Sequence, residues 1–301
     1  MLFKMELTRK QFDVLAAFAA AKEKLSQRQL EEKCGYSLGT VNKVVKEMTE
    51  LGYVNDGEIT PLGIDALEPY RAKKAIFIAA GFGSRMVPVT LNTPKPLIRV
   101  NGKRIIDTLI DACLEAGISE IYIVRGYLAE QFDQLLYKYP MIKFLENPSY
   151  NEANNISSAM VARYMLQNAY VFESDLIISN PAIIKKYHYN SDVLGIWKDR
   201  TDDWVLDVDK DGFVCDEKVG GINTYQMVGV YYFNAADGAK LSEHLKEAYQ
   251  APGGKERYWE TVPNLAYKGQ YRIEVLPCRE EDIVEIDTFR ELKAIDKSYD
   301  V

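Results

Sequence analysis

The pattern of hydrophobic and polar positions predicts helices in the first part of the chain, residues 1–70. Apolar residues recur there at intervals of three and four, the spacing of one helix face. Thr8 and Ser26 each precede a glutamine by three residues, which is the pattern of a capping box at a helix start. Ser37 suits the N-cap of a third helix. We therefore expect three helices, with a tight turn at Gly35 between the second and the third.

A β-hairpin is predicted after these helices. The stretch GYVNDGEIT places two short strands around Asp56 and Gly57, a strong turn signal. Thr60 and Pro61 then suit the N-cap and first turn of another helix. Two helices joined by a tight turn form a helix-turn-helix. With the hairpin and the trailing helix, residues 1–70 resemble a MarR-type winged-helix domain.

From Lys74 onward, predicted strands and helices alternate. The strands are 73–79, 119–125, 142–147 and 169–175, and the amphipathic helices are 104–117, 128–139 and 156–166. This alternation predicts an α/β domain over residues 74–301, with a mostly parallel, mixed, Rossmann-like sheet and helices on both faces. Residues 71–73 form the predicted linker.

The pattern becomes rich in β-strands after Asp192. Strand-like stretches at 192–198, 204–217 and 225–233 predict a small β-rich lid. Helices at 235–250 and 256–267, strands at 271–278 and 283–287, and a terminal helix complete the prediction.

Composition narrows the class of protein. At 301 residues the chain exceeds the usual size of one core, so two domains are expected. We expect neither a membrane span nor a signal peptide. The four cysteines form no C-x-x-C pair, which fits reduced thiols in a cytoplasmic protein. A net charge of −7 argues against nucleic acid as the main partner of the whole chain.

The winged-helix part gives weak support for DNA binding. Its residues 1–71 hold ten Lys or Arg and eleven Asp or Glu, so they form no basic patch. The predicted third helix nevertheless offers candidate groove and phosphate contacts at Thr40, Asn42, Lys43 and Lys46. A regulatory or dimerising module is favoured over DNA binding, and by analogy with MarR-type modules a homodimer is expected.

A glycine loop follows the first strand of the α/β part, in the stretch AAGFGSRMVPVTLNTPKPL. Gly81 and Gly83 lack side chains, so backbone N–H groups there can approach an anion or a base edge. The loop matches neither a dinucleotide fingerprint nor a Walker A motif. Ser84, Arg85 and Lys95 add a hydroxyl and two cations, which suit a polyphosphate.

Two acidic stretches should lie beside this loop. In open α/β sheets, ligands bind beyond the carboxyl ends of the strands. The stretch ESD follows a predicted strand and ends at Asp175, and EID near the C-terminus ends at Asp287. Two carboxylates converging on phosphates are the expected arrangement for binding Mg²⁺.

The glycine-loop stretch resembles the signature of the nucleotidyltransferase superfamily, and the likeness extends over residues 74–297. The segments GYLAEQF, ENPSYNEANNISSA, RYWE and VEID, together with the Trp204 segment, further resemble CTP:phosphocholine cytidylyltransferases. The resemblance implies transfer of CMP from CTP to phosphocholine, giving CDP-choline and pyrophosphate. It implies that Asp175 and Asp287 bind Mg²⁺, that Arg85 holds the triphosphate and that Lys95 holds the attacking phosphate. Glu173 and Glu285 are neighbouring acids with weaker claims.

Nucleotide contacts are expected from several segments. The candidates are Ala79, Ala80, Gly81, Gly83, Ser84, Arg85, Gly126, Tyr127, Asn154, Asn155 and Ser158. Asn154 and Asn155 have an alternative role, because an asparagine at this place also suits the cap of the following helix.

The acceptor site is expected to hold an ammonium group. Trp204, Tyr258 and Trp259 are the candidate aromatic faces and Glu260 is a candidate counter-charge. The family pattern has an aromatic residue before the EID acid, where this chain has Val284. Phosphoethanolamine, 2-aminoethylphosphonate and a sugar 1-phosphate therefore stay open as acceptors. An alternative function also stays open: the protein could be a transcription regulator whose nucleotidyltransferase-like domain only senses a metabolite.

Overall fold

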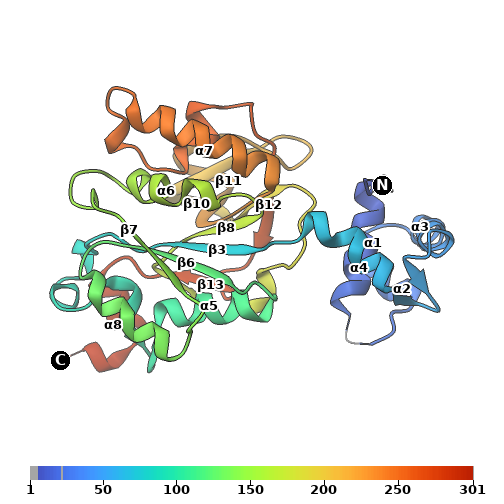
Figure 1. Cartoon of the computed structure of the whole chain (residues 1–301), viewed down its shortest axis with the longest axis horizontal. Helices are drawn as coiled ribbons and strands as arrows, with labels where there is room; N and C mark the ends of the chain where they lie inside the picture. The colour runs from blue at the N-terminus through green and yellow to red at the C-terminus, as the bar shows by residue number, and fades with distance from the viewer. Residues whose placement is uncertain (1–5, 22, 301) are drawn as a thin grey trace. The chain divides into compact units, whose positions relative to one another are not determined.

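The computed structural model describes residues 6–21 and 23–300, which form two compact units divided between Arg71 and Ala72 (Figure 1). The division falls inside the predicted linker, residues 71–73. Each unit has its own hydrophobic core and is described separately.

The N-terminal unit contains the predicted helices and hairpin. Its elements are α1 (Arg9–Ala20), α2 (Gln27–Cys34), α3 (Leu38–Glu50), β1 (Val54–Asn55), β2 (Glu58–Ile59) and α4 (Pro61–Leu67). Both capping boxes are formed, at Thr8 and at Ser26, and Gly35 ends α2 in the left-handed conformation that glycine tolerates best. Phe12 and Leu15 of α1 and Met48 of α3 are buried, so the apolar faces of these helices form the core.

The C-terminal unit is built on a seven-stranded mixed sheet. Its strand order is β12 (Ile273–Cys278), β10 (Ser191–Val208), β11 (Val214–Phe233), β8 (Ala169–Glu173), β3 (Lys74–Ile78), β6 (Glu120–Arg125) and β7 (Lys143–Glu146). The strands β8, β3, β6 and β7 are parallel, while β11 is antiparallel to both of its neighbours. The predicted parallel core of the sheet is confirmed.

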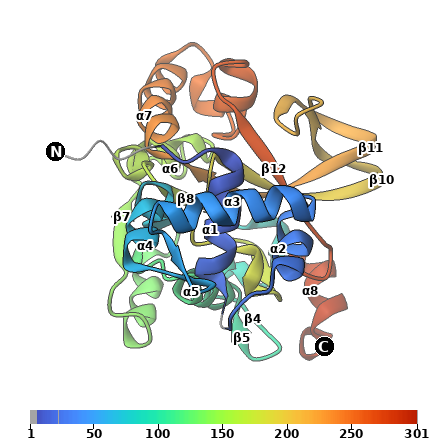
Figure 2. The same ribbon diagram turned by 90° about the vertical axis from the view of Figure 1, so that its right-hand side faces the viewer.

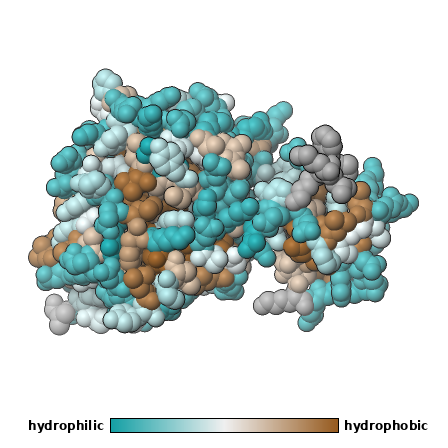
Figure 3. Space-filling model, viewed as in Figure 1, coloured by the Kyte–Doolittle hydropathy of each residue, from teal (hydrophilic) through white to brown (hydrophobic). Residues whose placement is uncertain are grey.

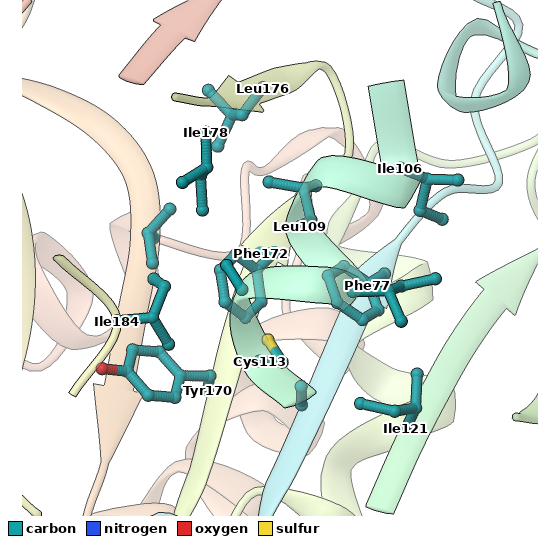
Figure 4. Packing of buried hydrophobic residues seen from close by; sticks show 14 of the residues in the cluster. Phe77, Ile106, Leu109, Cys113, Ile121, Tyr170, Phe172, Leu176, Ile178 and Ile184 are labelled. Atoms are coloured by element: carbon teal, nitrogen blue, oxygen red, sulfur yellow. The ribbon is translucent and has the colours of Figure 1, made fainter. Parts of the chain in front are cut away.

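Helices cover both faces of this sheet (Figure 1). Alternate residues of β3 and β8 point to opposite faces, as the strand period requires. Phe77 and Phe172 stack at 4.9 Å between their ring centroids and pack with α5 (Ile105–Glu115) in the core shown in Figure 4. On the other face, Ile76 and its neighbours pack with α6 (Ile156–Ala162) and α7 (Ala235–Gln250).

The predicted lid needs correction. Residues 192–196 of its first segment and 230–233 of its last segment are the inner ends of β10 and β11, which are buried and hydrogen-bonded within the central sheet. Beyond the sheet the two strands continue as a twisted ribbon, visible in Figure 2. The ribbon folds over itself, since Val205 pairs with both Lys218 and Gln226. Apolar residues on both faces of the inner ends explain this placement, because such strands are stable only inside a covered sheet.

Three other predictions are changed in detail. Residues 256–267 were predicted to form a helix, but they contain only a π-helical turn at Val262–Ala266. A 3₁₀ turn at Gly254–Glu256 precedes them. Residues Ala129–Tyr137 are 3₁₀-helical. The strand β13 (Ile283–Glu285) pairs with β9 (Leu176–Ile178) outside the main sheet, and α8 (Phe289–Ile295) is the predicted terminal helix. A further small pair, β4 (Arg99–Val100) and β5 (Lys103–Arg104), precedes α5.

Hydrophilic side chains dominate the face of the molecule seen in Figure 3, with hydrophobic ones grouped near the middle of the larger unit. Among the residues that the structure describes, no helix combines the length and the apolar character that a membrane crossing needs.

Candidate active site

A cavity of about 360 Å³ opens at the carboxyl ends of β3 and β8. This is the edge at which open α/β sheets bind their ligands. Twelve of the residues predicted from the sequence line it: Ala79, Ala80, Gly81, Gly83, Ser84, Arg85, Lys95, Asn154, Asn155, Ser158, Asp175 and Asp287. The fold therefore brings together segments that are up to two hundred residues apart.

The glycine loop leaves open backbone at one wall of the cavity. A Cβ atom built on Gly81 would meet no atom within 4 Å, so this position is free for a ligand. Gly83 has φ +61°, and its carbonyl accepts a 2.9 Å hydrogen bond from the hydroxyl of Thr90. A side chain at Gly83 would crowd Lys95, because its Cβ would lie 3.0 Å from that of the lysine. Glycine is thus required here for conformation and for space.

Four charged side chains meet beside the loop. Lys95 Nζ lies 2.8 Å from Asp175 Oδ2 and 3.0 Å from Asp287 Oδ1. Arg85 forms a bidentate pair with Asp287 at 2.7 and 2.8 Å. Burial lowers the pKa of Lys95, but the two carboxylates outweigh burial and the pKa is raised. Lys95 is therefore a fixed cation, and Arg85, which is largely exposed, is available to an incoming anion.

The acids of this cluster suit a divalent metal ion. One oxygen each of Asp175, Glu285 and Asp287 lies within 4.8 Å of the others. Asp175 Oδ1 is buried and has no hydrogen-bond partner among the described residues. Loss of solvation beside the cluster, and then repulsion by Asp175 and Asp287, raises the pKa of Glu285 to about 8, although its side chain is exposed at the surface. Hard oxygen ligands in such a cluster fit a small divalent cation.

Amide and hydroxyl groups line another part of the cavity, at the start of α6. Asn147 Nδ2 donates to the hydroxyls of Ser157 and Ser158 at 2.9 and 3.0 Å. Ser158 was predicted, whereas Asn147, Ser157 and Ser174 were not. Asn147 and Ser157 lie in the stretch ENPSYNEANNISSA, so this motif could have indicated that they line the cavity.

Gly126 and Tyr127 do not line the cavity, so their expected nucleotide contact stays a prediction. The Tyr127 hydroxyl donates to the carbonyls of Thr90 and Leu91 at 2.9 and 3.3 Å, so it holds the loop that carries Arg85 and Lys95. The absence of a side chain at Gly126 leaves space for the ring of Tyr150, since a Cβ there would lie 2.6 Å from that side chain.

Two aromatic residues of the cavity wall were missed by the sequence analysis. Phe82, between the two glycines, is 46% exposed, and its ring lies 5.5 Å from that of Tyr150. Aromatic side chains in loops carry no periodic pattern, so only their place in the stretches AAGFGSRMVPVTLNTPKPL and ENPSYNEANNISSA could have indicated them.

The predicted aromatic face at Trp259 also needs correction. Trp259 is 1% exposed and packs edge-on against Tyr231 and Phe233 in the core. Its indole Nε1 donates to Glu173 Oε1 at 2.8 Å, so Trp259 positions an acid instead of presenting a ring. Trp204 and Tyr258 do form an edge-to-face pair, with ring centroids 6.1 Å apart. Neither of them lines the described cavity.

Two acids, the partly buried Glu173 and the buried Glu260, lie next to each other near Trp259. Burial and the charge of Glu260 raise the pKa of Glu173 well above its ordinary value. Burial likewise raises the pKa of Glu260 to about 7. Among the described residues, neither acid has a cationic partner within ion-pair distance. Glu173 lines the cavity, whereas Glu260, which was predicted as a counter-charge for the substrate, does not.

Comparisons with known proteins agree with this geometry. Residues 74–192 match the nucleotidyl transferase family and residues 6–58 match the MarR family. The chain is 40% identical over 228 residues to a 2-aminoethylphosphonate cytidylyltransferase of Lancefieldella rimae, covering 75% of this chain and 92% of that protein. It is 30% identical over 229 residues to a choline-phosphate cytidylyltransferase of Streptococcus pneumoniae, covering 74% and 97%.

A solved structure shares the architecture of the C-terminal unit. The CTP:phosphocholine cytidylyltransferase of Streptococcus pneumoniae superposes with a TM-score of 0.70 at 29% identity, over 76% of this chain and 99% of that one. A putative glucose-1-phosphate thymidylyltransferase from Bacillus anthracis, at 17% identity and a TM-score of 0.60, shares the fold. With a winged-helix unit of the MarR family at its N-terminal end, the chain belongs to the cytidylyltransferases of the nucleotidyl transferase family.

Proposed function

We propose that the protein transfers CMP from CTP to 2-aminoethylphosphonate, releasing pyrophosphate, with Mg²⁺ as cofactor. The observation that carries this proposal is the pair of acids formed by the partly buried Glu173 and the buried Glu260, which have no cationic partner among the described residues. A buried carboxylate is costly without a counter-charge, so a cationic substrate group is expected beside them. A primary ammonium donates three hydrogen bonds and suits such acids better than a trimethylammonium, which donates none.

The aromatic residues support the same acceptor. A trimethylammonium group is usually held by several open aromatic faces. Trp259 is buried here, and Val284 stands before the acid of the EID motif. Only Trp204 and Tyr258 of the predicted set remain as open aromatic candidates. The 40% identity to a 2-aminoethylphosphonate cytidylyltransferase agrees with this choice.

In the proposed reaction, a phosphonate oxygen of the acceptor attacks the α-phosphorus of CTP. A new P–O bond forms, the bond from the α-phosphorus to the bridging oxygen breaks, and pyrophosphate leaves. Arg85 would bind the triphosphate, and Lys95 would hold the attacking oxygen and offset its charge. Asp175 and Asp287, with Glu285 beside them, would hold Mg²⁺, which neutralises charge on the phosphate oxygens.

The test is a grid of purified protein against four NTPs and four acceptors: 2-aminoethylphosphonate, phosphocholine, phosphoethanolamine and glucose 1-phosphate. Pyrophosphate release is followed with Mg²⁺ present and after EDTA. We expect the highest kcat/KM with CTP and 2-aminoethylphosphonate, and loss of turnover in EDTA. A preference for another acceptor would overturn the acceptor assignment, and absence of release with every pair would overturn the proposal as a whole.

Phosphocholine is the second candidate acceptor, supported by the edge-to-face pair of Trp204 and Tyr258. The two candidates separate in the variant Trp204→Ala. A cage for trimethylammonium predicts a loss of at least about tenfold in kcat/KM for phosphocholine, with CTP binding retained. Equal losses for both substrates would remove the aromatic cage from the account.

A further inference from the structure

The side chain of Asn155 connects the two acids Glu173 and Glu260. Its Nδ2 group donates to Glu173 Oε1 at 3.2 Å and to Glu260 Oε2 at 3.3 Å. Its Oδ1 atom accepts the backbone N–H of Trp259 at 2.9 Å. The orientation of the amide is therefore fixed, because only the nitrogen end can face two carboxylates. Both donor hydrogens are used, so neither is available to a nucleotide base.

The neighbouring residue, Asn154, reinforces this connection. Its backbone N–H donates to the carbonyl of Lys255 at 2.7 Å, and its Nδ2 donates to the carbonyl of Glu256 at 3.2 Å. Its Oδ1 accepts the N–H of Asn155 at 2.7 Å. The two asparagines thus make contacts with residues 255–260 along nearly the whole length of that segment.

Segment 255–260 has little regular structure to hold its shape. The expected helix is absent, and Gly254 approaches the end of α7 so closely that a Cβ would lie 2.1 Å from the carbonyl oxygen of Ala248. Asn155 stands at the N-cap of α6, yet its side chain makes no capping hydrogen bond. Its amide forms hydrogen bonds with residues 259 and 260 and with Glu173 instead of with the backbone of α6. The alternative helix-capping role of this side chain is therefore wrong.

We propose that Asn155 is a positioning residue for the acceptor: it holds Glu173 in place to face the ammonium group, with Glu260 as the second acid of the same hydrogen-bonded network, and it does not read the base. This inference rests on the proposed function, because it takes the acceptor to carry an ammonium. Glu173 Oε1 is occupied by Asn155 and by the indole of Trp259, while Oε2 has no hydrogen bond among the described residues and belongs to a side chain that lines the cavity. Fixing one oxygen orients the other toward the substrate.

The test compares two amide deletions, Asn155→Ala and Asn147→Ala, in the full-length protein. The KM for CTP and the KM for 2-aminoethylphosphonate are measured separately for each. We expect N155A to raise the acceptor KM by about tenfold or more and to change the CTP KM by less than about twofold. N147A, whose amide orients Ser157 and Ser158, is expected to raise the CTP KM more than the acceptor KM. Equal effects of N155A on both substrates, or a larger effect on CTP, would overturn the inference.

A double-mutant cycle tests whether Asn155 acts through Glu260. If it does, N155A and Glu260→Gln will be non-additive, and the double variant will have nearly the acceptor KM of E260Q alone. Full additivity would contradict the connection. Thermal melting of every variant checks folding, and Asn155→Ser, with the same expected outcomes, replaces N155A if the alanine variant unfolds.

The proposed function and this inference fail in different ways. If the wild-type protein prefers an acceptor without an ammonium group, the proposed function fails. The KM split is then measured with that acceptor, and an N155A variant that leaves its KM unchanged overturns the inference as well. A wild-type protein that uses 2-aminoethylphosphonate, together with an N155A variant that impairs only CTP, sinks the inference alone.

Discussion

Two neighbouring groups of acids at the cavity treat charge in opposite ways: Asp175 and Asp287, here called the phosphate end, and Glu173 and Glu260, which we propose as the acceptor end. At the phosphate end, the protein supplies its own cations, since Lys95 and Arg85 pair with Asp175 and Asp287 at 2.7 to 3.0 Å. At the proposed acceptor end, the partly buried Glu173 has no cationic partner among the described residues, and it receives only neutral donors. This difference indicates which ligands suit each end: the phosphate end suits anions and a metal ion, and the acceptor end suits a cation.

The largest expected effect comes from breaking the phosphate end with Asp175→Asn. This change removes a metal ligand and a partner of Lys95 while keeping the side-chain volume. We expect kcat to fall by about a thousandfold or more, measured as pyrophosphate release, because charge neutralisation carries most of the catalysis. Unchanged far-UV circular dichroism and an intact melting transition are the control. Turnover within tenfold of the wild type would contradict the role of this acid.

The acceptor end is tested by Trp259→Phe. The substitution keeps an aromatic ring in the core but removes the indole N–H that donates to Glu173. We expect a several-fold rise in the acceptor KM with little change in the CTP KM, since only one oriented hydrogen bond is lost. The same substitution at Trp197 of β10, a tryptophan that is 51% exposed, is the matched control and should leave both values unchanged. A shift in the CTP KM alone would break the division between the two ends.

The pH dependence of stability gives a smaller effect. Burial raises the pKa of Glu260 from 4.5 to about 7. A raised folded-state pKa means that the stability contributed by this group is fully present below pH 4.5 and is lost as the pH rises through about 7. The variant Glu260→Gln cannot ionise, so its stability relative to the wild type should increase between pH 5 and pH 8, as measured by urea unfolding. The exposed Glu152→Gln is the control, and a parallel pH dependence in wild type and E260Q would refute the expectation.

The smallest effect is expected from Tyr127→Phe. The hydroxyl of Tyr127 holds the carbonyls of Thr90 and Leu91 in the loop between Arg85 and Lys95. Its loss should raise the CTP KM by a few-fold without changing the preference between acceptors, because the loop is also held by other hydrogen bonds. Tyr137→Phe, at a tyrosine that is 96% exposed, serves as the control. An altered acceptor preference in Y127F would place this residue at the other end of the site.

The phosphate end could be predicted from the sequence because most of it is local. Gly81, Arg85 and Lys95 lie in one loop directly after a strand with a clear apolar pattern. Asp175 comes after the carboxyl end of a parallel strand, so the position of the cavity followed from the sheet. The winged-helix unit was predictable for the same reason, since its caps and turns are local signals.

The acceptor end was harder to predict because long-range hydrogen bonds shape it. The stretch ERYWETVPNLAY has helical spacing, yet its contacts with Asn154 and Asn155, about one hundred residues earlier, hold it in another conformation. Trp259 was expected to be an open face because pattern alone does not distinguish a buried ring from a binding one. Likewise, the hydrogen bonds of the Asn155 amide join residues that are 18 and 105 positions apart in the chain, so no local pattern indicates them.

A competition experiment tests most directly whether the acceptor end receives a primary ammonium group, as we propose. The purified protein is given CTP and equal concentrations of 2-aminoethylphosphonate and phosphocholine, and the two products are quantified by mass spectrometry during the first few per cent of turnover. Their ratio equals the ratio of kcat/KM values. We predict that the amount of the CMP ester of 2-aminoethylphosphonate exceeds the amount of CDP-choline by at least about tenfold. An excess of CDP-choline would contradict it.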